Sequence, residues 1–85
     1  MSVRILYFAS LREDMGIAQE LIDLPAGACD VKGLRARLVA RGGASAAALG
    51  RGKAVRVSVN QDLARDDTPV KAGDEVAFFP PVTGG

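Results

Sequence analysis

The chain contains no histidine and no tryptophan among its 85 residues. Histidine is the commonest general base and the commonest transition-metal ligand, so its absence closes the usual routes to acid–base and metal chemistry. The only cysteine, Cys29, cannot form an intrachain disulfide, and a lone cysteine mostly behaves as a small hydrophobic residue. The acidic residues match no metal-ligand spacing, so we expect no metal site.

Aromatic residues are few and the charge is balanced. The net charge is +1, and the aromatic residues are Tyr7, Phe8, Phe78 and Phe79. Nucleic-acid and membrane-surface binding normally need a basic patch, and base stacking needs interleaved aromatics. The apolar stretch 3–11 is interrupted by Arg4, is too short to span a bilayer and lacks a signal cleavage site. We therefore expect a cytoplasmic protein that binds neither nucleic acid nor membrane.

The length and composition fit one small globular domain. Apolar residues make up 48% and charged residues 25%, ordinary values for such a domain. We expect residues 1–79 to form the domain and residues 80–85 to form an extended tail. Pro80 and Pro81 fix their φ angles and stiffen the start of this tail, which could reach roughly 20 Å when extended.

Four segments have the pattern of β-strands. Residues 3–8 are rich in β-branched and aromatic side chains, and residues 17–24 follow as an antiparallel partner. Residues 55–59 alternate valine with polar residues, and residues 75–79 run into the tail. Residues 63–64 predict a short further strand. The polar stretch 10–16 and the stretch 66–73, with its proline and glycine, are expected to be connections.

One main helix is predicted between the strands. Asp30 is a good N-cap, and Val31, Leu34 and Leu38 form one helical stripe. Gly42-Gly43 should end this helix, and residues 44–49 should form a short helical segment. The helix arginines are expected to face solvent: Arg35, Arg37 and Arg41.

The order of elements predicts an α+β fold. A helix between two strand groups allows the first and last strands to pair at the centre, which is a β-grasp. We expect a mixed sheet of about five strands, with the main helix packed on one face and a flexible C-terminal tail. Its core should contain Val3, Ile5, Tyr7, Leu34, Leu38 and Val57.

Apolar side chains are also expected on the opposite face of this sheet. If Val3 and its face meet the helix, Leu6 and Phe8 lie outside, and one of Phe78 and Phe79 does too. An exposed apolar patch usually marks an interaction site. The alternative is that flanking loops cover these rings.

The closing Gly84-Gly85 predicts a reactive terminus. Without Cβ atoms the segment can enter a narrow channel, and the carbonyl carbon of Gly85 is open to a nucleophile once its carboxylate is activated. The alternative is an ordinary loose chain end.

Several segments together carry a family resemblance. They are Ile5-Leu6-Tyr7-Phe8-Ala9 with Leu11-Arg12-Glu13, then Val59-Asn60-Gln61 before Leu63, and the closing run 73–85. In these segments the chain resembles the small subunits of molybdopterin synthase, the sulfur carriers of molybdenum-cofactor biosynthesis. A terminal Gly-Gly alone is shared with ubiquitin and other carriers, whereas the closing run is specific.

The resemblance implies a ubiquitin-like fold and a defined chemistry. An E1-like enzyme would use ATP to adenylate Gly85, and a sulfur donor would convert the adenylate into a thiocarboxylate. The sulfur would pass to cyclic pyranopterin monophosphate in the active site of the large synthase subunit, within a heterotetramer. The chain itself would bind no cofactor and be the non-catalytic, sulfur-donating subunit of a sulfurtransferase complex.

The resemblance also implies contact residues for the large subunit. Those on the domain are Phe8, Arg12, Leu63 and Phe79. Those on the tail are Pro80, Pro81, Val82 and Thr83, which precede the reactive Gly84-Gly85.

Three other functions remain open on the sequence. The chain could carry sulfur for another pathway, such as thiamin synthesis or tRNA thiolation. It could be a ubiquitin-like modifier that joins its tail to lysines. It could also be a β-grasp binding module with an inert tail.

Overall fold

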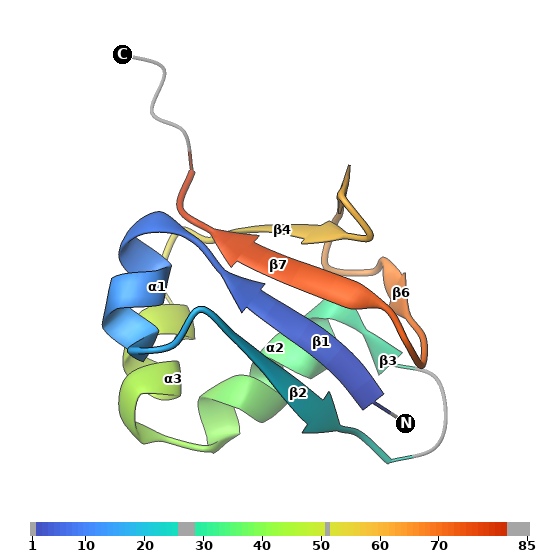
Figure 1. Cartoon of the computed structure of the whole chain (residues 1–85), viewed down its shortest axis with the longest axis horizontal. Coiled ribbons are helices and arrows are strands. Elements are labelled where there is room, and N and C mark those ends of the chain that lie inside the picture. Colours follow the sequence, from blue (N-terminus) through green and yellow to red (C-terminus); the bar gives the residue numbers. More distant parts are fainter. Residues whose placement is uncertain (1, 26–28, 51, 82–85) are drawn as a thin grey trace.

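The computed structural model describes residues 2–25, 29–50 and 52–81, and its centre is a five-stranded mixed sheet. The strands are β1 (Ser2–Tyr7), β2 (Gln19–Asp23), β4 (Arg56–Val59), β5 (Asp62–Leu63) and β7 (Glu75–Phe79). Their order is β2-β1-β7-β4-β5, with β1 and β7 parallel and the other neighbours antiparallel (Figure 1). The first and last strands thus pair centrally, and the predicted β-grasp is confirmed.

The main helix, α2 (Val31–Ala40), lies across one face of the sheet (Figure 1). Its predicted cap is confirmed, because the Asp30 carboxylate accepts a hydrogen bond of 2.7 Å from the Gly33 amide. A Cβ on Gly33 would stand 3.1 Å from that carboxylate oxygen, so glycine leaves room for the cap. The predicted short helix is α3 (Gly43–Leu49), entered through Gly42 at φ +76°.

The prediction that residues 10–16 form a connection is wrong, because a further helix, α1 (Ala9–Met15), lies there. The charged run 12–14 gives the segment a polar appearance. Leu11 and Met15, four residues apart, nevertheless fall on one helical face, where Leu11 is buried and Met15 packs against the core. Ala9 enters the helix with a left-handed backbone at φ +53°, which sequence patterns do not reveal.

A second, two-stranded sheet was not predicted either. It pairs β3 (Cys29–Asp30) with β6 (Pro69–Val70) in antiparallel fashion. Each strand has two residues, too few to show a period. The pairing joins the segment before α2 to the stretch 66–73, which was expected to be a connection. Val70 of β6 is buried.

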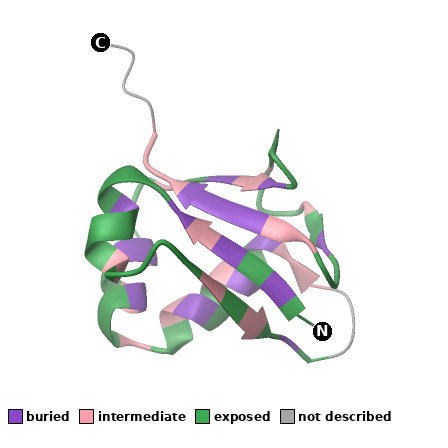
Figure 2. Ribbon diagram, viewed as in Figure 1, coloured by how far each residue is buried: buried purple, intermediate pink, exposed green. Residues whose placement is uncertain are grey.

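The predicted core is confirmed. All six predicted residues are buried, and they are joined by Val76, Phe78 and Leu49, among others. Buried and exposed residues alternate along β1, as Figure 2 shows, because successive side chains of a strand point to opposite faces. The Tyr7 and Phe78 rings stack at a centroid distance of 6.2 Å, which ties the two central strands together inside the core.

Of the three helix arginines predicted to face solvent, Arg37 and Arg41 are exposed and Arg35 is partly buried, and both Arg35 and Arg41 have protein partners. Arg35 donates hydrogen bonds to the carbonyls of Leu49, Gly50 and Lys53, at 2.7, 3.3 and 3.0 Å. It thereby fixes the connection from α3 to β4. Arg41 instead reaches the edge strand β2, whereas Arg37 is exposed as expected.

A polar network joins β1, β2 and the helices at one edge of the core. Arg41 donates two hydrogen bonds to Glu20, at 2.8 and 3.0 Å, and one to Ser45. The Tyr7 hydroxyl donates to Glu20 at 2.7 Å. The hydrogen bond from Arg41 is the main cause that lowers the pKa of Glu20, and burial is the main cause that raises the pKa of Tyr7.

A hydrogen-bonded turn fixes the start of β7. Asn60 donates to the Asp74 carboxylate at 3.0 Å and accepts from the Glu75 amide at 3.0 Å. The Lys71 amide donates to the other Asp74 oxygen, and these bonds lower the pKa of Asp74, with Asn60 the larger cause. The two sequence motifs that contain Asn60 and Asp74 therefore serve to hold the strand that leads to the tail.

We expect Glu20→Gln to lower the free energy of unfolding by about 1 kcal/mol at neutral pH, because the amide loses its charged partner Arg41. Since folding lowers the pKa of Glu20, the bridge contributes fully above the ordinary glutamate value of 4.5 and is lost as pH falls through the lowered pKa. Urea unfolding across the acid range should therefore show the two proteins converging at low pH. A constant difference at all pH values would contradict this assignment.

Asn60→Ala should cost about 2 kcal/mol of unfolding free energy, because it removes two hydrogen bonds and leaves alanine at φ +51°. The neighbouring Gln61→Gly is the matched control. Gln61 also has a positive φ, of +72°, and its glycine variant should be neutral or stabilising. Thermal unfolding measures both. Equal losses in the two variants would show that the Asn60 side chain does not hold the turn.

Candidate functional site

The strand that leads to the tail, β7, is a central and largely buried strand of the sheet. β7 pairs with β1 on one side and β4 on the other, and Val76 and Phe78 are fully buried. The β1 pairing extends beyond the strand, since the Phe8 amide donates to the Phe78 carbonyl at 3.1 Å. Pro80 and Pro81 follow at once, each half-buried. Anything attached after Phe79 therefore starts from a fixed point.

The predicted reactive residues, Gly84 and Gly85, lie outside the described part of the chain, and so do the predicted tail contacts Val82 and Thr83. The structure gives the position from which they start, and their roles remain predictions.

The second part of the candidate site is the sheet face that α2 does not cover. The register places Leu6, Ala77, Ser58 and Leu63 in one row across β1, β7, β4 and β5. A neighbouring row continues from Phe8 through Phe79 to Arg56. Phe8 is 50% exposed and Leu63 65% exposed, and Phe79 is half-buried. We call this surface the outer face, defined by Leu6, Phe8, Leu63, Ala77 and Phe79.

The exposure of the outer face distinguishes between the two alternatives for the aromatic rings, which were an exposed apolar patch or rings covered by flanking loops. Phe78 points into the core and Phe79 away from it, as the alternation along β7 requires. The described loops do not bury Phe8, so the exposed apolar patch is real. Such a patch is a feature of interaction sites.

Three of the four predicted domain contacts lie near one another and one lies apart. Phe8 precedes α1, and its carbonyl accepts from the Arg12 amide, so Phe8 and Arg12 are one helical turn apart. Phe79 lies beside them on β7. Leu63 lies two strands away on β5, across the same face. Ala77 lies on the same face as Phe79 but is buried, so it contributes little exposed surface to this face.

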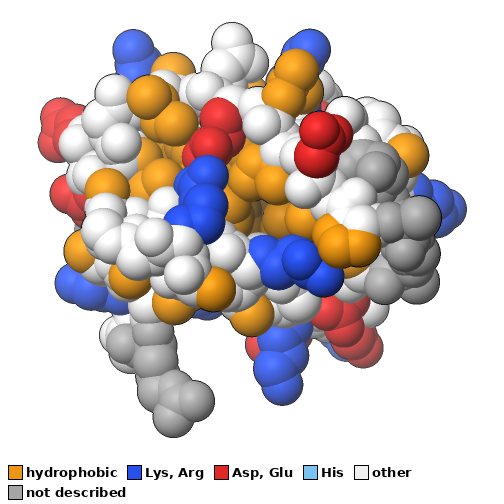
Figure 3. Space-filling view, turned by 90° about the horizontal axis from the view of Figure 1, so that it is seen from below, with side chains coloured by type: hydrophobic (Ala, Val, Ile, Leu, Met, Phe, Trp, Pro, Cys, Tyr) orange, Lys and Arg blue, Asp and Glu red, His pale blue; other side chains and the backbone are white. Residues whose placement is uncertain are grey.

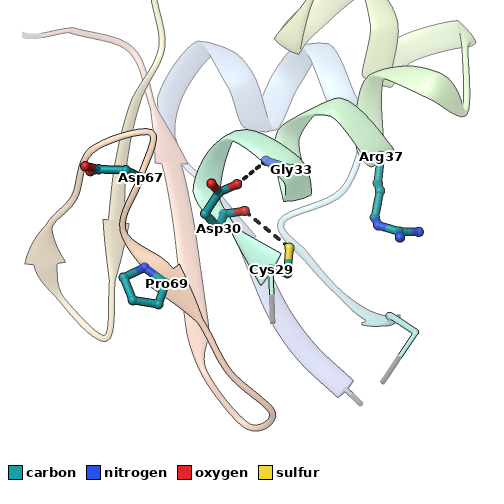
Figure 4. Close-up of a pocket in the computed structure, with 6 residues that line it drawn as sticks. All are labelled: Cys29, Asp30, Gly33, Arg37, Asp67 and Pro69. Atoms are coloured by element: carbon teal, nitrogen blue, oxygen red, sulfur yellow. Dashed lines mark hydrogen bonds between the residues drawn. The ribbon is translucent and has the colours of Figure 1, made fainter. Parts of the chain in front are cut away.

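The hollow around Cys29 does not form a reactive site. It measures about 390 Å³ and is lined by Cys29, Asp30, Gly33, Arg37, Asp67 and Pro69 (Figure 4). The Cys29 thiol donates to the Asp30 carbonyl at 3.2 Å, and burial is the main cause that raises its pKa. A thiol with a raised pKa is mostly protonated at neutral pH and is a poor nucleophile.

The described residues offer no other chemical centre. Among them, no three His, Cys, Asp or Glu side chains gather closely enough to hold a metal ion. None of the described helices has the length and apolar character needed to cross a bilayer. The geometry therefore points to a surface and an attached tail rather than to a catalytic cleft.

Comparison with known sequences identifies relatives along nearly the whole chain. The model of the ThiS family matches residues 5–85. The chain is 42% identical over 83 residues to the molybdopterin synthase sulfur carrier subunit of Escherichia coli strain K12, and the match covers 98% of this chain and 99% of that protein.

Solved structures share the fold along the whole chain. SAMP1 from Haloferax volcanii matches with a TM-score of 0.80 and 30% identity, covering 100% of both chains. A chain from the complex of subunits 1 and 2 of the molybdopterin-converting factor of Helicobacter pylori 26695 matches with a TM-score of 0.68 and 29% identity, again covering 100% of both. With the family match spanning nearly every residue from Ile5 onward, this chain belongs to the ThiS family.

Proposed function

We propose that this chain is the sulfur carrier of molybdopterin synthesis, and that Gly85 carries the sulfur. The observation that carries the proposal is the central, buried strand β7, which ends at Phe79, directly before the sequence that closes on Gly84-Gly85. The near-complete coverage of the Escherichia coli carrier supports it, because the similarity extends to both ends of that protein.

The chemistry needs only the terminal carboxylate. In the proposed sequence, an E1-like enzyme joins the Gly85 carboxylate to AMP from ATP and releases pyrophosphate. Sulfide-level sulfur released by a donor protein then attacks the carbonyl carbon, and AMP leaves, which gives the thiocarboxylate. The thiocarboxylate sulfur then bonds to a carbon of cyclic pyranopterin monophosphate, and water cleaves the bond between this sulfur and the Gly85 carbonyl, so that the sulfur stays on the pterin and Gly85 regains its carboxylate. This use of ATP fits a cytoplasmic location.

The chain contributes position rather than catalysis. A sulfur atom on a tethered tail is present at a high effective concentration in the partner's site. Pro80 and Pro81 restrict the first tail residues, and the missing Cβ atoms of Gly84 and Gly85 allow passage through a narrow channel. The fixed end of β7 makes the reach of the tail reproducible.

The outer face is the proposed docking surface for the large synthase subunit. Phe8, Phe79 and Leu63 would supply apolar contact, and Arg12 a charged contact at the rim. The Helicobacter pylori relative was solved in a complex of subunits 1 and 2. We propose an equivalent pairing here, in a heterotetramer of two small and two large subunits, with Val82 and Thr83 following the prolines into the active site.

Incubation with a competent activating enzyme, ATP and a sulfur donor should raise the intact mass by the exchange of one oxygen for sulfur. The gain should disappear when Gly85 is deleted, or when a residue is added after it, because the reactive carboxylate is then displaced. Both altered proteins should keep their thermal stability, since neither change touches the core. A sulfur gain on the extended protein would overturn the assignment to Gly85.

The two adjacent phenylalanines give a matched pair of variants. Phe79→Asp should remain folded and weaken binding to the large subunit at least tenfold, because it places a charge in the outer face. Phe78→Ala should instead cost about 3–5 kcal/mol of stability, since its ring is fully buried. Calorimetric titration and thermal unfolding separate the two effects. If Phe79→Asp lowers stability and leaves affinity unchanged, the outer face is not the docking surface.

A further inference from the structure

The strand β2 forms an open edge of the five-stranded sheet. In its antiparallel pairing with β1, hydrogen-bonded and non-bonded residue pairs alternate. The Tyr7 amide donates a hydrogen bond to the Ala18 carbonyl, so Tyr7 and Ala18 form a hydrogen-bonded pair. Every second residue of β2 after Ala18 then forms such a pair with β1. The backbone groups of Glu20 and Ile22 therefore face β1. Those of Gln19, Leu21 and Asp23 point away from the sheet, where no further strand follows among the described residues.

An apolar hollow lies beside this edge, between β2 and α2. Figure 3 shows hydrophobic side chains at the bottom of a hollow that charged side chains surround, on the face where α2, α3 and β2 lie. Ile22 points toward the helices and is only partly buried, although it packs against the core. On the other side of the strand, Leu21 is 71% exposed. The edge thus offers apolar contact on both faces.

The helical wall of the hollow is cationic. The helix α2 contains Lys32, Arg35 and Arg37 and no aspartate or glutamate. Arg41 reaches Glu20 on β2, and Arg37 lies one turn earlier on the same side of α2. Arg37 is exposed and forms no salt bridge with another residue of the described ranges. An extended segment in the hollow would therefore meet a guanidinium without a salt bridge, although Asp30 and Asp67 line the Cys29 hollow together with Arg37.

We propose that this edge docks an extended segment of a partner protein with aliphatic residues flanked by acidic ones. The segment would add to the sheet as a strand beside β2, bonded to the outward backbone groups of Gln19, Leu21 and Asp23. Alternate side chains would fill the hollow beside Ile22 and cover Leu21, and its acidic residues would pair with Arg37. This function differs from sulfur transfer, because it uses the outward backbone groups of the β2 edge rather than the tail, although Leu21 lies on the same sheet face as Leu6.

The charge pattern favours such a segment over a second copy of the chain. Pairing of β2 with β2 would place two α2 helices on the same face of a continuous sheet. The Arg37 side chains of both copies would then face the shared hollow, where like charges repel. An acidic segment neutralises the same charge.

The experiment is a titration of the isotope-labelled full chain, followed by amide NMR, with the capped peptide DEVIVIEE. We expect saturable shifts centred on Gln19, Leu21 and Asp23 and on α2, with a dissociation constant below about 1 mM. The peptide KKVIVIKK tests the charge requirement, and DEVPVIEE tests the strand pairing, since proline lacks the amide donor. Both should bind at least about fivefold more weakly.

Variants of the chain test the same two contacts. Arg37→Glu should weaken the first peptide at least about fivefold, whereas Lys53→Glu, an equal charge change beside the Arg35 side of α2, should change affinity less than twofold. Leu21→Pro removes an outward amide without breaking the bonds to β1, and should also weaken binding. If the Leu21→Pro variant unfolds, the Arg37→Glu variant alone tests the proposal.

Three results would overturn the proposal. The first is the absence of saturable shifts with the first peptide. The second is a set of shifts confined to the outer face around Phe8 and Phe79. The third is concentration-dependent self-association, measured by sedimentation without peptide, that shifts the amides of residues 19–23 and shows a second copy to be the occupant.

Discussion

The parallel pairing of β1 with β7 is the constraint on which the rest of the structure depends. It brings residues from the two ends of the domain to the centre of one sheet, with Ile5 opposite Val76 and Tyr7 opposite Phe78. The buried Tyr7–Phe78 stack makes this pairing part of the core rather than a surface contact. The strand that leads to the tail therefore cannot shift register without breaking the core.

The same pairing organises both functional surfaces. With β7 central, its outward residues lie between those of β1 and β4, which creates the outer face at the base of the tail. With β1 central, β2 becomes an edge, and its free backbone groups lie beside the cationic helix α2. The proposed sulfur transfer uses the tail and the outer face around β7, and the proposed peptide docking uses the backbone of the β2 edge; the two surfaces adjoin at Leu6, whose register partner is Gln19.

Much of the fold follows from the sequence because its signals are local. The alternation at residues 55–59, the Asp30 cap and the glycine pair after α2 each determine structure within a few residues. The helix α1 was missed because three consecutive charged residues mask the pair Leu11 and Met15. The sheet of β3 and β6 and the carbonyl contacts of Arg35 depend on partners distant in sequence, which no periodicity encodes. The roles of the tail residues rest on the chemistry of Gly84-Gly85 and on the family resemblance, and residues 82–85 lie outside the described part of the chain.

The central claim is that the thiocarboxylate at Gly85 supplies the sulfur of molybdopterin. The most direct measurement is a single-turnover reaction of the purified thiocarboxylated chain with the large synthase subunit and cyclic pyranopterin monophosphate, followed by intact mass and product analysis. The account predicts that two thiocarboxylated chains return to their carboxylate mass for each molybdopterin formed, because its dithiolene contains two sulfur atoms. Sulfur that stays on the chain in the presence of both components, with no molybdopterin formed, would contradict it.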